Sequence, residues 1–197
     1  VIGFNKTGTT SIETALKDLG YIPADQWHFT LLFDNFLKGK ISYSQIIDCC
    51  ETAEFFQDVP FSMLGFWKKL YDRYPNAKYI LSVRDNSEQW FQSLYNYHCE
   101  KYGDGNNVTE KQLKDAYGKS GMAFRLIMNN YNGLPLYDSS SYQNVYNGHN
   151  DEVINFFNNK NNFLKINVSD SISYKKLCEF LEVKPLADNF PWLNKTK

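Results

Sequence analysis

The amino-acid sequence predicts an α/β protein in which helices cover both faces of a central parallel sheet. Two observations lead to this prediction. Short apolar runs alternate with stretches in which apolar residues recur at helical spacing, as in a three-layer α/β/α fold. Polar turns follow two of the apolar runs, one after Phe4 and one after Val83. Ligands of parallel sheets bind beyond the carboxyl ends of the strands, so we expect both turns at one binding edge.

The first half of the chain alternates in this way from its first residue. Residues 1–4 are a strand-like apolar run, and helical spacing begins at Ile12 and ends near Gly20. Further helices are predicted where apolar residues recur every three or four positions: 29–37, 46–53 and 64–71. A short buried strand is predicted at 55–59, ended by Pro60.

The second half opens with the clearest strand of the sequence, residues 78–83. The turn Arg84–Ser87 contains good helix caps, and a helix carrying Trp90 and Tyr95 follows it. Residues 103–107 are a glycine and asparagine loop. We then expect a helix over 113–128, an irregular stretch to about residue 141, and three further elements: a helix at 153–157, a strand at 163–168 and a helix at 177–181.

Length and composition limit the classes of function. A chain of 197 residues suits one domain, so we treat 1–197 as a single domain, and the strand-like start at Val1 leads us to expect residues before it. The net charge of −1 gives no reason to expect nucleic acid or an anionic membrane as partner. No apolar run approaches the roughly 18 residues that a membrane span needs. The four cysteines lack metal-ligand spacing, so we expect reduced thiols and no metal. The oligomeric state stays open.

The segment Gly3–Ser11 has the properties of an anion site. It joins a strand to a helix, where unpaired N–H groups and the positive helix end face the loop. Gly8 permits close approach of a ligand, and Lys6 adds a cation. In the usual nucleoside-triphosphate loop the lysine directly follows the second glycine. Here Lys6 precedes Gly8, so the usual magnesium-binding hydroxyl has no counterpart.

Lys6-Thr7-Gly8-Thr9-Thr10-Ser11 resembles the 5′-phosphosulfate loop of sulfotransferases that use PAPS (3′-phosphoadenosine 5′-phosphosulfate), whose fold is related to nucleotide kinases. Residues 79–93 are similar to the family's 3′-phosphate motif, an arginine at a strand end with a serine on the next helix. The ending 189–196 is similar to the family's closing segment. The resemblance covers nearly the whole chain.

The resemblance implies which residues hold the donor and its product PAP (adenosine 3′,5′-bisphosphate). Lys6 through Ser11 would contact the 5′ end, with the hydroxyls of Thr9 and Thr10 on the phosphate. Arg84 would bind the 3′-phosphate together with Ser93. Ser93 lies nine positions after Arg84 where the family spacing is eight, so Ser87 is an alternative. Ser11 stands where cytosolic members often carry an aromatic residue, and their glycine-rich basic segment is missing.

The resemblance also implies a mechanism of in-line displacement on sulfur. Lys6 would stabilise charge on the leaving oxygen, and a histidine or carboxylate would take the proton of a hydroxyl or amine acceptor. We predict Asp58 as this base because it ends a predicted strand at the binding edge. His98, several turns into a helix that we expect to lead away from the loop, is the alternative. The acceptor is expected to be a small molecule or a carbohydrate.

Two other functions compete with this prediction. A kinase or nucleoside-triphosphate hydrolase on the same fold would need magnesium and ATP, and the position of Lys6 argues against it. A degenerate nucleotide-binding module without transfer activity is the third hypothesis. Asn5 begins an Asn-x-Thr triplet within the loop, where a glycan would block the site, so we expect a cytoplasmic protein.

Overall fold

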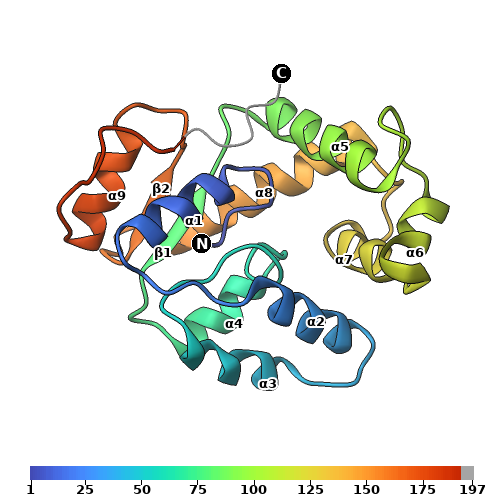
Figure 1. Ribbon diagram of the computed structural model, residues 1–197, viewed down its shortest axis with the longest axis horizontal. Coiled ribbons are helices and arrows are strands. Elements are labelled where there is room, and N and C mark those ends of the chain that lie inside the picture. The colour runs from blue at the N-terminus through green and yellow to red at the C-terminus, as the bar shows by residue number, and fades with distance from the viewer. Residues whose placement is uncertain (192–197) are drawn as a thin grey trace.

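A computed structural model describes residues 1–191 of the chain (Figure 1). Most of the predicted closing segment, residues 192–196, therefore lies outside the described residues. The strands are β1, Tyr79–Ser82, and β2, Phe163–Ile166. The helices are α1 Thr9–Asp18, α2 Gln26–Leu37, α3 Tyr43–Asp48, the 3₁₀ helix η1 Cys49–Thr52, α4 Phe66–Arg73, α5 Ser87–Tyr102, α6 Glu110–Lys119, α7 Met122–Tyr131, α8 Ser139–Phe157 and α9 Ser173–Leu181.

The sheet is parallel, as predicted, but smaller than expected. β1 pairs with β2 in register from Tyr79 opposite Phe163. On the other side of β1, the Ile2 amide donates to the Ile80 carbonyl at 2.8 Å, although 1–4 is not assigned as a strand. The predicted strand 55–59 is reduced to one parallel bridge, between Phe55 and Pro23. Asp58 has a φ of 56°, which ends any extended run there.

Apolar side chains cover both faces of β1. Tyr79 and Leu81 belong to a buried cluster with residues of α2, α3, α4, α7 and α8. Ile80 belongs to a second cluster with residues of α1 and α9. All four β1 residues are buried, which is typical of a parallel strand enclosed on both sides. The carboxyl ends of the strands are thus held in a rigid frame.

Two helical predictions were wrong in their bounds. The helix expected over 113–128 is split into α6 and α7, because Gly118 and Gly121 both take left-handed backbone (φ 73° and 68°). α8 begins at Ser139, well before the expected 153. Its buried stripe uses residues that an apolar pattern undervalues: Tyr142, Tyr146, His149, Val153 and Phe157. The spacing of these residues is helical throughout.

Candidate functional site

The loop between the first extended segment and α1, residues 4–8 (the Lys6 loop), is tightly constrained. Lys6 and Gly8 both have left-handed backbone, with φ of 70° and 91°. A Cβ on Gly8 would stand 2.4 Å from Cγ2 of Val168, in the turn after β2. Only glycine fits at this position, because both the φ and the contact exclude a side chain. The helix α1 starts directly after Gly8, with its positive end toward the loop.

The hydroxyls of the loop divide into inward and outward groups. Thr7 is fully buried, donates to the Phe4 carbonyl at 2.5 Å and lies 2.6 Å from the Ser82 hydroxyl. Its hydroxyl therefore fixes the loop to the end of β1 and faces no ligand. The side chains of Thr9 and Ser11 are also buried, whereas Thr10 is exposed.

Arg84 and Trp90 hold the main chain of the loop. Arg84 Nε donates to the Lys6 carbonyl at 2.6 Å, and Trp90 Nε1 donates to the Asn5 carbonyl at 3.0 Å. The Arg84 amide is in turn bound by the Tyr146 hydroxyl at 3.0 Å. Within the described residues, the terminal guanidinium nitrogens of Arg84 have no hydrogen-bond partner. They are free to meet an anion beside the loop.

The two candidate serines occupy different sides of α5, which begins at its Asn86 cap with a 2.8 Å bond to the Gln89 amide. The Ser87 hydroxyl donates to Gln143 of α8 at 3.0 Å. Ser93 follows Trp90 by one turn, on the side of α5 that faces the loop. Its hydroxyl is buried and has no partner among the described residues.

Asp85, which the sequence analysis did not single out, connects two strand ends. Its carboxylate accepts from Asn167 at 2.5 Å and from Gln89 at 3.0 Å. The turn after β1 is thereby tied to the turn after β2, which carries the Val168 side chain that lies against Gly8. An Arg-Asp pair at a strand end is a weak signal in sequence, and only the fold reveals this link.

Asp58 lies next to the Lys6 loop, although the strand on which its prediction rested is not formed. Its carboxylate accepts from the Val59 amide at 2.9 Å and from the side chain of Asn5, a loop residue. Burial raises the pKa of Asp58, against the effect of these two hydrogen bonds and of the Lys101 charge. Gln57 donates to Glu13 of α1 at 2.5 Å, which holds this segment against the helix.

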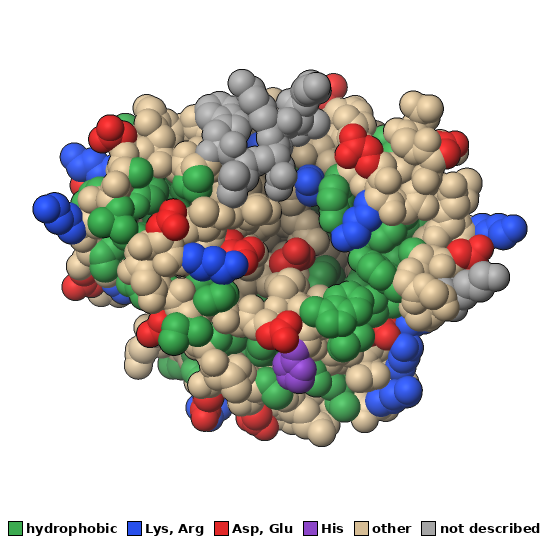
Figure 2. Space-filling model, in the orientation of Figure 1, with side chains coloured by type: hydrophobic (Ala, Val, Ile, Leu, Met, Phe, Trp, Pro, Cys, Tyr) green, Lys and Arg blue, Asp and Glu red, His purple; other side chains and the backbone are tan. Residues whose placement is uncertain are grey.

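The charge of Lys6 lies close enough to Asp58 for the two groups to influence each other. Burial, and then the charge of Arg84, lower the pKa of Lys6, while Glu100 and Asp58 raise it. Figure 2 shows a face of the molecule that is hollowed near its middle, with acidic side chains and a group of hydrophobic side chains around the hollow. A lysine beside a partly desolvated carboxylate can stabilise negative charge at one atom and accept a proton at another.

His98 is buried on α5, and its Nδ1 lies 2.7 Å from the Tyr137 hydroxyl. Burial, together with the charges of Lys101 and Lys6, lowers the pKa of His98 to about 3. The expectation that α5 leads away from the loop was wrong, since its Tyr97 ring lies under the Lys6 ammonium. His98 also lines a cavity of about 80 Å³ together with Asn5 and Val59.

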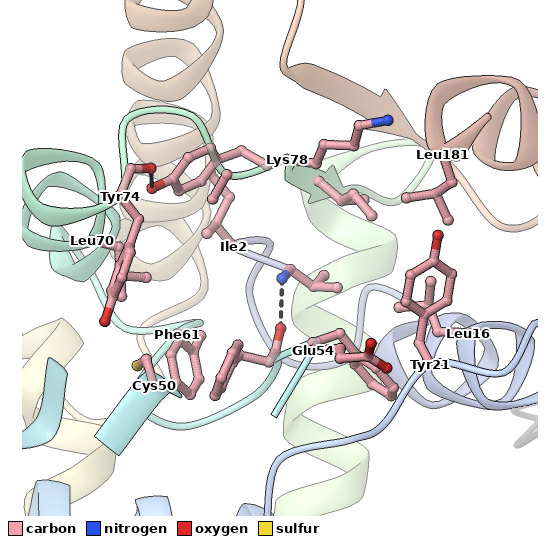
Figure 3. A pocket seen from close by; sticks show the side chains of 16 residues that line it. Ile2, Leu16, Tyr21, Cys50, Glu54, Phe61, Leu70, Tyr74, Lys78 and Leu181 are labelled. Carbon is pink, nitrogen blue, oxygen red and sulfur yellow. Dashed lines mark hydrogen bonds between the residues drawn. The ribbon is translucent and has the colours of Figure 1, made fainter. Parts of the chain in front are cut away.

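A larger cavity of about 450 Å³ lies elsewhere, around Ile2, Leu16, Tyr21 and Leu70 (Figure 3). Its walls are largely apolar, and the backbone nitrogen of Val1, beside it, donates to the Phe56 carbonyl at 2.6 Å. None of the predicted site residues lines it. Arg84 and Ser87 instead line a cavity of about 320 Å³ beyond the carboxyl end of β1, where ligands of parallel sheets bind.

Over residues 1–191, no group of histidine, cysteine, aspartate and glutamate side chains could hold a metal ion. No helix in that range is long and apolar enough to cross a membrane.

A family model described as a sulfotransferase domain matches residues 1–197, the whole chain. No curated protein matches the sequence.

Proposed function

The chain belongs to the sulfotransferase domain family, and from this premise we propose that it transfers a sulfuryl group from PAPS to a hydroxyl or amine acceptor by in-line displacement. The observation that carries the proposal is the proximity of the two charges: the Asp58 carboxylate raises the pKa of Lys6, and Asn5, the neighbour of Lys6 in the loop, hydrogen-bonds to that carboxylate. A charge stabiliser and a base are the two groups that such a transfer needs.

The residues around the loop fit the donor. Gly8 lets the loop pack against Val168, and the start of α1 directly after it offers amide donors to a 5′-phosphate. The exposed Thr10 can add its hydroxyl there. The guanidinium end of Arg84 and the unpartnered hydroxyl of Ser93 are suited to a 3′-phosphate. When bound, PAPS would supply the sulfuryl group and a bisphosphate leaving group.

The chain's own groups then have separate tasks. Lys6 holds its positive charge where the bridging oxygen gains negative charge as the sulfur–oxygen bond breaks. Asp58 takes the proton that the acceptor loses as the new bond to sulfur forms. Its raised pKa makes it a stronger base than an exposed aspartate. His98 remains the alternative base.

Three further parts of the proposal concern the fold, the location of the protein in the cell and the acceptor. The burial of both faces of β1 supports a three-layer, nucleotide-kinase-like arrangement. The Asn5 side chain, which binds the carboxylate of Asp58, leaves no room for a glycan, in keeping with action in the cytoplasm. The acceptor is proposed to be a small molecule or a carbohydrate, and no step requires a metal.

The test is a comparison of ligands by thermal shift. PAP without metal should stabilise the protein by about 2.7 kcal/mol at a hundredfold excess over its dissociation constant. AMP, which lacks the 3′-phosphate, should stabilise it much less. Equal effects of PAP and AMP would remove Arg84 and Ser93 from the proposal. A response to ATP with magnesium alone would favour the kinase alternative.

A further inference from the structure

We propose that Tyr97 is a positioning residue that aims the Lys6 ammonium at the reacting centre. This inference rests on the proposed function, in which Lys6 is the charge stabiliser. The Lys6 Nζ lies 4.1 Å from the centre of the Tyr97 ring. An ammonium at this distance from an aromatic face is attracted by the ring quadrupole.

The main chain of Lys6 is fixed independently of its side chain. The left-handed φ of 70° and the bond from Arg84 Nε to the Lys6 carbonyl define where the side chain leaves the loop. The four-carbon stem beyond that point rotates freely unless something holds its end. The Tyr97 ring provides this restraint from α5.

Tyr97 is itself held in place. Lys101, one turn further along α5, donates to the Tyr97 hydroxyl at 2.7 Å. Lys101 Nζ also lies 5.4 Å from the ring centre of Tyr102. Two turns earlier on the same helix, Trp90 holds the loop main chain at the Asn5 carbonyl. α5 thus constrains both parts of the loop, the backbone through Trp90 and the charged end of Lys6 through Tyr97.

The groups around Lys6 determine the direction in which its pKa should move when the Tyr97 ring is removed. The groups that face it are Arg84 from the turn after β1, Glu100 and Lys101 from α5, and Asp58 from the segment before Pro60. Arg84 and Lys101 lower the pKa of Lys6, and the two carboxylates raise it. The Tyr97 ring favours the charged form, so its removal should lower the pKa of Lys6 further.

The decisive experiment measures Lys6 directly and needs no acceptor. Acylation of Lys6 by acetic anhydride is followed against pH by peptide mass spectrometry, with Lys6→Ala identifying the labelled peptide. In Tyr97→Leu the midpoint should move to lower pH by roughly half a unit to one and a half units. Tyr97→Phe keeps the ring and should stay near the parent.

Turnover provides the second readout. Tyr97→Leu should lower kcat about three- to thirtyfold with little change in the KM for PAPS, and Tyr97→Phe should restore most of it. Tyr95→Leu is the matched control: Tyr95 is on the same helix, but its hydroxyl donates to Asn107 at 3.1 Å, away from the loop. Tyr95→Leu should leave the pH midpoint of Lys6 acylation unchanged.

An unchanged Lys6 midpoint in Tyr97→Leu overturns the inference. If that variant does not fold, as judged by circular dichroism, Tyr97→Met takes its place, because methionine is unbranched and favours helix. A failure of the proposed function looks different: Lys6→Ala would keep normal turnover, whatever happens at Tyr97.

Discussion

The Lys6 loop and the segment around Asp58 lie next to each other, but they are held in place in opposite ways. The loop is held from outside by Ser82 of β1, by Arg84 of the turn after β1 and by Trp90 of α5. The Asp58 carboxylate is held by its own neighbour Val59 and by Asn5, a residue of the loop. The proposed base, Asp58, is therefore held in part by the loop, whereas the bonds that hold the main chain of the loop come from other residues.

This difference predicts an asymmetry between substitutions on the two sides. A change at Asp58 should alter turnover and leave the binding of PAP nearly intact. A change that moves the loop should alter both, because in the proposed function the loop binds the donor, and Asn5 of the loop hydrogen-bonds to Asp58. The predictions below test this asymmetry, beginning with the largest expected effect.

Asp58→Asn should lower turnover by about 10²–10⁴-fold, because it removes the basic oxygen and keeps a similar shape. The affinity for PAP should stay within a few-fold. Turnover is measured as PAP release from PAPS with phenolic, carbohydrate and amine acceptors. A base acts when deprotonated, so parent turnover should rise as pH increases through the raised pKa of Asp58, and the variant should lose this dependence.

His98→Gln is the comparison for Asp58→Asn, and it should lower turnover less than tenfold. With a pKa lowered to about 3, His98 stays neutral over the pH range of an assay and cannot produce an acidic limb there. If His98→Gln abolishes turnover while Asp58→Asn preserves it, the roles are reversed and the histidine is the base.

Lys6→Ala should lower turnover by roughly two to three orders of magnitude, as expected for loss of one preorganised charge stabiliser. PAP should bind less tightly, but by a smaller factor, because the amides at the start of α1 remain. Isothermal titration with PAP separates the two effects. Near-normal turnover would mean that Lys6 is only a surface cation at a helix start.

Gly8→Ala should weaken PAP binding by about ten- to a hundredfold. Its Cβ would stand 2.4 Å from Val168, so the loop or the turn after β2 has to move. Gly20→Ala is a matched control, with a similar φ of 94° and no atom within 4 Å of the added Cβ. Both variants carry the cost of left-handed backbone, about 1–2 kcal/mol, but only Gly8→Ala should disturb PAP binding. If Gly8→Ala and Gly20→Ala bind PAP with equal affinity, the contact of Gly8 with Val168 does not shape the site.

The Lys6 loop and the segment around Asp58 also differ in how well the sequence predicted them. The strand–loop–helix order at Lys6 is local, so its pattern predicted the loop, and the family model confirms the family. The Asp58 side is assembled from distant segments. Its strand was mispredicted because left-handed backbone at Asp58 is invisible in an apolar pattern. Tyr97 and Asp85 were missed because their contacts cross between elements, although Trp90, Ser93 and Tyr97 have the spacing of one helix face.

The smallest effect concerns the serine that binds the 3′-phosphate, which spacing alone left open between Ser87 and Ser93. The Ser87 hydroxyl already donates to Gln143, so a phosphate would have to compete for it. The Ser93 hydroxyl is buried, has no partner among residues 1–191 and lies on the side of α5 that faces the loop.

A hydrogen bond to a charged group contributes about 1.5 kcal/mol or more, so Ser93→Ala should weaken PAP binding about tenfold. AMP binding should not change, because AMP lacks the 3′-phosphate. Ser87→Ala should change neither affinity by more than about twofold, since it loses only its two hydrogen bonds to Gln143 and Asn147 of α8. The reverse pattern would assign the 3′-phosphate to Ser87 and would mean that the extra residue between Arg84 and Ser93 turns the helix face away from the donor.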